Sequence, residues 1–124
     1  KEAFLSEWIL SIISEKNFSL GEINYIFCDD EYLHKLNVEF LNHDTLTDII
    51  SFDNTVGNLV SGDIFISVER VKENAIDFNV SFDEELYRVM IHGVLHYLGF
   101  NDKSEKDNLV MRKAENDALM LLSY

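Results

Sequence analysis

The sequence predicts an α+β fold: a single domain in which a small sheet of three to four strands is covered by about five helices. Three observations support this prediction. Short β-branched runs alternate with apolar stripes at helical spacing. A chain of 124 residues can bury one core but not two. Its hydrophobic content of 47% is ordinary for a globular domain, and no repeat or low-complexity tract divides it.

The first helix is predicted from apolar residues that recur every three to four positions near the start of the chain. Its polar side carries the acidic residues Glu2, Glu7 and Glu15, whereas a helix that binds a membrane surface needs a basic polar side. We therefore expect it to pack on the core. The apolar residues are Phe4, Leu5, Trp8, Ile9, Ile12 and Ile13.

A first strand is predicted at 22–27, where Ile23, Tyr25 and Phe27 alternate with the residues between them. A second helix follows. Asp29 or Asp30 can accept hydrogen bonds from backbone N–H groups at its start, as N-cap residues do. One face of this helix is predicted to carry Leu33, Leu36, Asn37 and Phe40.

Two further strands are predicted at 47–52 and 63–66, because both runs are apolar and rich in β-branched or aromatic residues. The segment 54–61 between them contains Gly57 and is expected to form a turn or loop. Ser67 then caps a third helix. The apolar residues of that helix are Val68, Val71, Ala75 and Ile76.

The fourth helix is predicted to be central and buried. Ser81 and Glu84 form an S-x-x-E capping box at its start. Its apolar residues then occupy most of its circumference, which is typical of a buried helix; they are Leu86, Val89, Met90, Val94 and Tyr97. Ser104 caps a last helix, whose packed stripe is predicted to contain Met111, Ala114, Ala118 and Leu121.

The central helix also carries a candidate metal site. His92 and His96 are four residues apart, so both imidazoles lie on one helical face and can reach a single ion. Gly99 is suited to a left-handed turn that ends the helix, and Asp102 follows six residues after His96. Two imidazoles, one carboxylate and an open position are typical of catalytic metal sites, most commonly of zinc. The alternative is that both histidines are ordinary helix residues.

The stretch 92–102, HGVLHYLGFND, resembles the YbeY family of metal-dependent endoribonucleases, whose pattern is a helical HGxLH, a Gly turn and a third ligand. The resemblance implies His92, His96 and Asp102 as metal ligands, with His92 and His96 as catalytic residues. Asp102 occupies the slot where the family has His, and Asn101 precedes it. Position 93 is Gly, so the glutamate general base of HExxH peptidases is missing.

The resemblance extends over nearly the whole chain and implies one YbeY-like domain at 1–124 with a mixed sheet and an edge strand beside the metal cleft. Three more blocks carry it. Leu36-Asn37 and the run 47–52 resemble the family's LN…PTDVLSF block, and 61–64 resembles its GDI strand. Met111 and Glu115 occupy its M-x-x-x-E slots.

The chain departs from the family pattern at Leu41, where the family has Arg, and at Leu46, where it has Pro. Between residues 36 and 69 there is no Lys or Arg, and His43 alone could become cationic. The net charge of −13 argues against a general nucleic-acid binder, because such proteins bind mainly by neutralising phosphates. Cleavage of RNA would therefore depend on the metal ion and a few local cations, for which Lys103 is the candidate phosphate contact.

Three other polar residues leave two interpretations open. Asp48 and Asp63 can satisfy backbone N–H groups at strand edges, or orient a ligand imidazole from behind. Arg88 lies one turn before His92 and can pair with Glu84 or Glu85, or contact a phosphate.

The resemblance implies a metal-dependent endoribonuclease that acts on single-stranded RNA, notably ribosomal RNA precursors, in maturation and quality control of the small ribosomal subunit. The cofactor would be one divalent ion, zinc being the commonest. The lone Cys28 and the lack of a membrane or signal segment indicate a cytoplasmic protein without a membrane partner. Two alternatives remain: a metallopeptidase-like hydrolase, and a non-catalytic ribosome-assembly protein with a structural metal.

Overall fold

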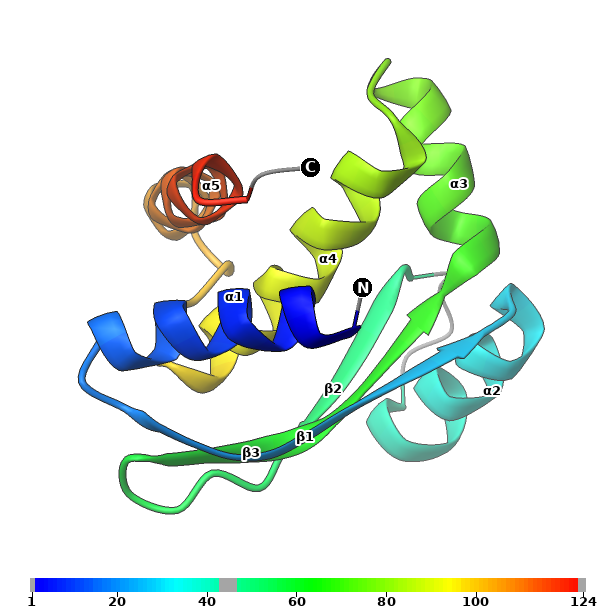
Figure 1. The fold of residues 1–124 in the computed structure, drawn as a ribbon. Helices are drawn as coiled ribbons and strands as arrows, with labels where there is room; N and C mark the ends of the chain where they lie inside the picture. Colours follow the sequence, from blue (N-terminus) through cyan, green and yellow to red (C-terminus); the bar gives the residue numbers. More distant parts are fainter. Residues whose placement is uncertain (1, 43–46, 123–124) are drawn as a thin grey trace.

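The computed structural model describes residues 2–42 and 47–122, and in this part of the chain five helices surround a sheet of three strands (Figure 1). The α+β fold class and the number of helices are as predicted. His43 and Leu46, two of the positions singled out in the sequence, lie outside the described residues. The elements in order are α1 (Glu2–Glu15), β1 (Ser19–Cys28), α2 (Asp30–Leu41), β2 (Ile49–Asp53), β3 (Leu59–Ser67), α3 (Val68–Asp77), α4 (Phe82–Tyr97) and α5 (Glu105–Met120).

Side-chain caps explain where four of these helices begin. Asp29, rather than Asp30, accepts the N–H of Tyr32 at the start of α2. Ser67, Ser81 and Ser104 do the same for α3, α4 and α5, as the sequence predicts; each hydroxyl accepts an N–H three residues on. Each cap satisfies a backbone donor that has no partner within the helix, which fixes the residue at which the helix starts.

The sheet is mixed, with the strand order β1-β3-β2. β1 runs parallel to β3, and β2 pairs with β3 in the antiparallel direction. β3 is therefore the central strand, and alternate residues along it are buried. In Figure 1, α1 and α4 lie over one face of the sheet and α2 lies against the other.

β3 is longer than the predicted strand at 63–66. The turn before it contains Gly57, whose φ of 59° lies in the left-handed region, and Val56 pairs with Leu59 directly across the turn. Parallel pairing with β1 extends the strand back to Leu59, and antiparallel pairing with β2 reaches back to Gly62. Pairing with both neighbours, rather than local propensity, sets the length of this strand.

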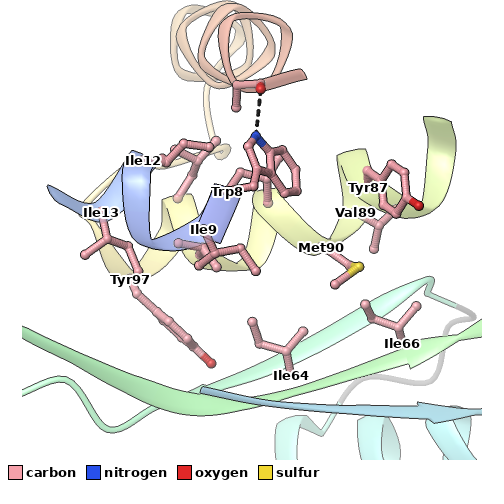
Figure 2. Close-up of a cluster of buried hydrophobic side chains, with 14 of the residues drawn as sticks. Trp8, Ile9, Ile12, Ile13, Ile64, Ile66, Tyr87, Val89, Met90 and Tyr97 are labelled. Atoms are coloured by element: carbon pink, nitrogen blue, oxygen red, sulfur yellow. Dashed lines mark hydrogen bonds between the residues drawn. The ribbon is translucent and has the colours of Figure 1, made fainter. Parts of the chain in front are cut away.

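The core lies between α1, α4 and the sheet, and α5 is attached at its edge (Figure 2). Trp8 of α1 packs edge-on against Tyr87 of α4, with ring centroids 6.3 Å apart. Its indole N–H donates to the carbonyl oxygen of Ala118 in α5 over 2.9 Å. This bond satisfies the buried N–H and ties α5 to α1, as buried Trp residues require.

α4 contacts the sheet closely through Gly93 and Tyr97. A Cβ at position 93 would lie 3.0 Å from a methyl group of Ile64 and 3.1 Å from one of Ile49. The Tyr97 hydroxyl donates to the carbonyl oxygen of Phe52 over 3.0 Å. These contacts fix the rotation of α4 about its axis and its distance from the sheet. They therefore also fix the direction in which His92 and His96 point.

Four apolar residues of the predicted helices are exposed. In α3, Ile76 is 72% and Val68 38% exposed, because only Val71 and Ala75 of that helix are buried. Phe40 at the end of α2 is exposed but lies edge-on to Phe52 of β2. Leu121 is exposed because α5 ends at Met120, and Leu122 is buried in its place. None of the helices in the described residues combines the length and the apolar character that a membrane span needs.

Candidate metal centre

Three donor atoms converge at the end of α4. His92 and His96 lie one turn apart on the same face, and their Nε2 atoms are 3.1 Å from each other. The chain then reverses at Gly99, whose φ of 101° is in the left-handed region, and returns Asp102 to the helix. Oδ2 of Asp102 is 3.1 Å from Nε2 of His96 and 3.3 Å from Nε2 of His92. The structure thus brings together all three residues that the sequence predicts as ligands.

The spacing and chemistry of these donors fit one divalent ion. In a tetrahedral site with bonds of about 2.0–2.1 Å, neighbouring donor atoms lie about 3.3 Å apart. The three separations of 3.1, 3.1 and 3.3 Å are close to that value. Two imidazole nitrogens and one carboxylate oxygen are ligands that zinc accepts, and three protein ligands would leave a fourth position for water or substrate.

Glu115 of α5 holds the His92 ring from behind. Its Oε2 is 2.6 Å from Nδ1 of His92, and the residue is only 5% exposed. A carboxylate accepts hydrogen bonds, so Nδ1 carries the proton and the lone pair of Nε2 is directed at His96 and Asp102. Glu115 therefore sets the tautomer that a metal ligand needs. Sequence reasoning placed Glu115 in a family motif but gave it no role.

Both members of this pair have shifted pKa values. Burial lowers the pKa of His92, but the hydrogen bond with Glu115 and the charges of Glu115 and Asp102 outweigh it, so the net shift is upward. Burial raises the pKa of Glu115, but the hydrogen bonds from His92 and Arg88 outweigh it, so the net shift is downward. Glu115 is accordingly a carboxylate, the form in which it accepts the hydrogen bond from Nδ1–H of His92.

Two arginines compensate the buried charge of Glu115. Nη1 of Arg88 is 3.0 Å from Oε1 of Glu115, and Nη1 of Arg112 is 3.5 Å from the same atom. Arg88 thus pairs with Glu115 on α5 rather than with Glu84 or Glu85 on its own helix. The sequence predicts partners on the same helix because helical spacing identifies only residues three or four positions apart. The pairing of Arg88 with Glu115 depends instead on the packing of α4 on α5.

Neither Asp48 nor Asp63 has a hydrogen bond to a ligand imidazole in the described residues. Asp48 lies near the centre but accepts a weak hydrogen bond, 3.4 Å long, from Asn74 of α3; burial raises its pKa. Asp63 accepts a hydrogen bond of 3.1 Å from Asn24 of β1. Glu115 occupies the place behind His92 that either aspartate could have filled.

Two hollows lie beside the centre and share His92, Arg112 and Glu115 in their walls. The larger, of about 240 Å³, is bordered by Asp48, Asn74 and Ile49, the first residue of edge strand β2. The smaller, of about 190 Å³, is bordered by Asp102 and Asn108. Lys103 is exposed next to Asp102 but lines neither hollow, and neither does Leu41. The prediction that Lys103 contacts phosphate stays a prediction.

Comparison with protein families gives a consistent result over almost the whole chain. Residues 2–123 match the family model described as Endoribonuclease YbeY. A protein of that name from Flavobacterium johnsoniae is 62% identical over 120 residues, which cover 97% of this chain and 86% of the relative. One from Porphyromonas gingivalis is 46% identical over 122 residues, which cover 98% of this chain and 81% of the relative.

A solved structure shares the fold. The solution structure of TM1509 from Thermotoga maritima matches with a TM-score of 0.66 and 30% sequence identity. The match covers 94% of this chain and 79% of the other.

Proposed function

The chain belongs to the YbeY family of endoribonucleases, and from this premise we propose that it cleaves single-stranded RNA hydrolytically at a divalent metal ion held by His92, His96 and Asp102. The observation that carries the proposal is the convergence of three donor atoms at the separations a single ion requires. The whole chain, 1–124, forms one such domain.

The ion is zinc in this proposal, because two imidazoles and a carboxylate in an open site are the ligands of many catalytic zinc centres. When bound, such an ion would supply Lewis acidity toward a phosphoryl oxygen or a water. His92 and His96 would hold it through Nε2, and Glu115 keeps the proton of His92 on Nδ1. Asp102 adds a negative charge to the ligand set where the family has a neutral imidazole.

Substrates are ribosomal RNA precursors, and the protein acts in the cytoplasm in maturation and quality control of the small ribosomal subunit. The relatives named Endoribonuclease YbeY support RNA as the substrate class. The net charge of −13 fits a protein that recognises RNA at one local site rather than along a basic surface.

Family membership decides against a metallopeptidase, and the fold gives a physical reason. Position 93, where an HExxH peptidase has its glutamate, faces Ile64 and Ile49 of the sheet and has no room for a longer side chain. A carboxylate there could not reach the donors of His92 and His96. The remaining alternative, a non-catalytic assembly protein with a structural metal, is distinguished by experiment.

The test combines metal content with RNA cleavage. Protein purified without a chelating column should contain about one divalent ion per chain in the wild type and in Asp102→His, and much less in Asp102→Ala. His96→Ala should lose cleavage of single-stranded RNA. His34→Ala, which removes a histidine of α2 outside the donor cluster, is the matched control and should retain both.

Two results would count against the proposal. Equal metal content in the wild type, Asp102→His and Asp102→Ala would show that Asp102 is not a ligand. Cleavage that survives in His96→Ala would show that the activity belongs to a contaminant, and the assembly-protein alternative would then stand.

A further inference from the structure

We propose that Arg112 is a substrate-binding residue, which clamps a phosphate of the RNA strand in the smaller hollow beside Asp102. The inference rests on the proposed function and adds to it the place where the polyanion is held. It answers a question raised by the sequence, because a chain with a net charge of −13 needs a local cation to hold RNA.

Arg112 is placed to reach a ligand in both hollows beside the donor cluster, since its side chain lines each of them. The side chain is 57% exposed. Its one ion pair within the described residues joins Nη1 to Oε1 of Glu115 at 3.5 Å, which is long for such a contact. Because more than half of the side chain is exposed, the guanidinium fork has donors left that can bind two oxygens of a phosphate.

Among the cations of the described residues, only Arg88 and Arg112 line either hollow. Arg88 also lines the larger hollow, but its side chain is only 16% exposed and its contact with Glu115 is short, at 3.0 Å. Arg70 of α3 is held by Asp30 at 2.8 Å and by Glu73 at 3.3 Å. Exposed Lys103 is close in sequence to Asp102 but lines neither hollow.

Each hollow is lined by one more carboxylate than arginine, so the side chains alone do not decide which of them takes a phosphate. Only the smaller is lined by Asp102, whose ion in the proposed function would add positive charge there. In the smaller, Asn108 lies four residues before Arg112, so both side chains project from the same face of α5. The amide of Asn108 offers a second donor, and the charge of Asp102 is offset by the ion it binds in the proposed function.

The test measures the RNA-binding constant K at several salt concentrations. Each phosphate that a protein neutralises adds a fixed amount to the slope of log K against log salt. The metal-loaded protein is titrated against a short fluorescein-labelled, 2′-O-methylated RNA, chosen to resist hydrolysis, at NaCl concentrations from about 20 to about 200 mM. Arg112→Ala should weaken binding about tenfold at low salt. It should also lower the slope of log K against log salt by about 0.7, the value for one phosphate on a single strand.

Lys113→Ala is the matched control. Lys113 is the next cation on α5, but it is exposed on another side, where it pairs with Asp117 at 3.1 Å. This variant should keep the wild-type slope and affinity. Arg112→Lys should keep most of the slope, because the charge remains, but bind more weakly than the wild type, because the fork is lost.

Zinc affinity is measured on the same proteins to exclude an indirect effect through Glu115 and His92. In Arg112→Ala it should fall much less than RNA affinity does, because Arg88 still pairs with Glu115 at 3.0 Å. A slope unchanged by Arg112→Ala, no binding by the wild type even at low salt, or a fall in zinc affinity that matches the fall in RNA binding would each overturn the inference. An unchanged slope or a matching fall in zinc affinity leaves the proposed function standing. The proposed function fails instead if the wild type does not bind RNA, or binds it but never cleaves it.

Discussion

The two sides of α4 make different kinds of contact, although neighbouring residues form them. Gly93 and Tyr97 face the sheet, where the space is filled and a single added methyl group would contact Ile64 and Ile49. His92 and His96 face the turn at Gly99 and helix α5, where every contact described above joins polar atoms. One helix thus carries a side specified by shape and a side specified by hydrogen bonds and charge.

The difference shows how the polar side can exist next to the core. A buried carboxylate such as Glu115 costs several kcal/mol unless its oxygens are paired. Glu115 pairs with His92 through one oxygen and with Arg88 and Arg112 through the other. The close contact at Gly93 holds α4 at the height where these partners meet. Precision on the sheet side therefore supports the geometry of the donor side.

The largest effect, on the free energy of unfolding, is expected from Gly93→Glu. This variant places the glutamate of an HExxH peptidase on the side of α4 that faces the sheet. Gly93→Glu would direct a charged side chain toward the sheet, where the nearest neighbours are methyl groups of Ile64 and Ile49. We expect the free energy of unfolding to fall by about 3–5 kcal/mol, the range for an uncompensated buried charge. Urea unfolding followed by tryptophan fluorescence of Trp8 measures it.

Gly93→Ala separates the charge from the added volume. Its Cβ would meet the ends of two flexible isoleucine side chains, and alanine favours a helix over glycine by up to about 1 kcal/mol. The net change should therefore stay within about 1 kcal/mol. A Gly93→Glu protein as stable as the wild type, or one with peptidase activity, would show that position 93 does not face the sheet.

A smaller effect, confined to the donor side, is expected from Glu115→Gln. The amide oxygen can still accept the hydrogen bond from Nδ1–H of His92, but the negative charge that makes the ring a better ligand is lost. Zinc affinity should fall about 10- to 100-fold, as it does when such supporting carboxylates are removed. Competition with a chromophoric chelator measures the affinity, and nitrogen NMR of the His92 ring shows which nitrogen carries the proton.

Asp117→Asn is the control for this experiment, because it removes one negative charge from the exposed side of the same helix. It should leave zinc affinity unchanged. If Glu115→Gln also left the affinity unchanged, Glu115 would serve only the packing of α4 on α5.

The same contrast explains what the sequence could predict. The cluster of three donor side chains could be predicted because it is local in sequence: His92 and His96 are one turn apart, and Gly99 with Asp102 follows directly. The cap residues Ser67, Ser81 and Ser104 could be predicted for the same reason. The family resemblance supplied the mixed sheet, which no local pattern specifies.

What the sequence could not predict depends on contacts between distant segments. Glu115 lies 23 residues from His92, and only the packing of α5 on α4 brings them together. The partner of Arg88 was predicted wrongly for that reason. Glu115 did carry one clue, since a charged residue four positions after buried Met111 shares the packed side of its helix. A buried charge on such a side needs a partner.

The central claim, that His92, His96 and Asp102 together hold one divalent ion, is tested most directly by X-ray absorption of the zinc-loaded protein. We expect only nitrogen and oxygen neighbours at about 2.0–2.2 Å, with the outer scattering of two imidazoles, and one fewer protein ligand in Asp102→Ala. A spectrum with one imidazole or none, or with a sulfur neighbour from the lone Cys28, would contradict the account.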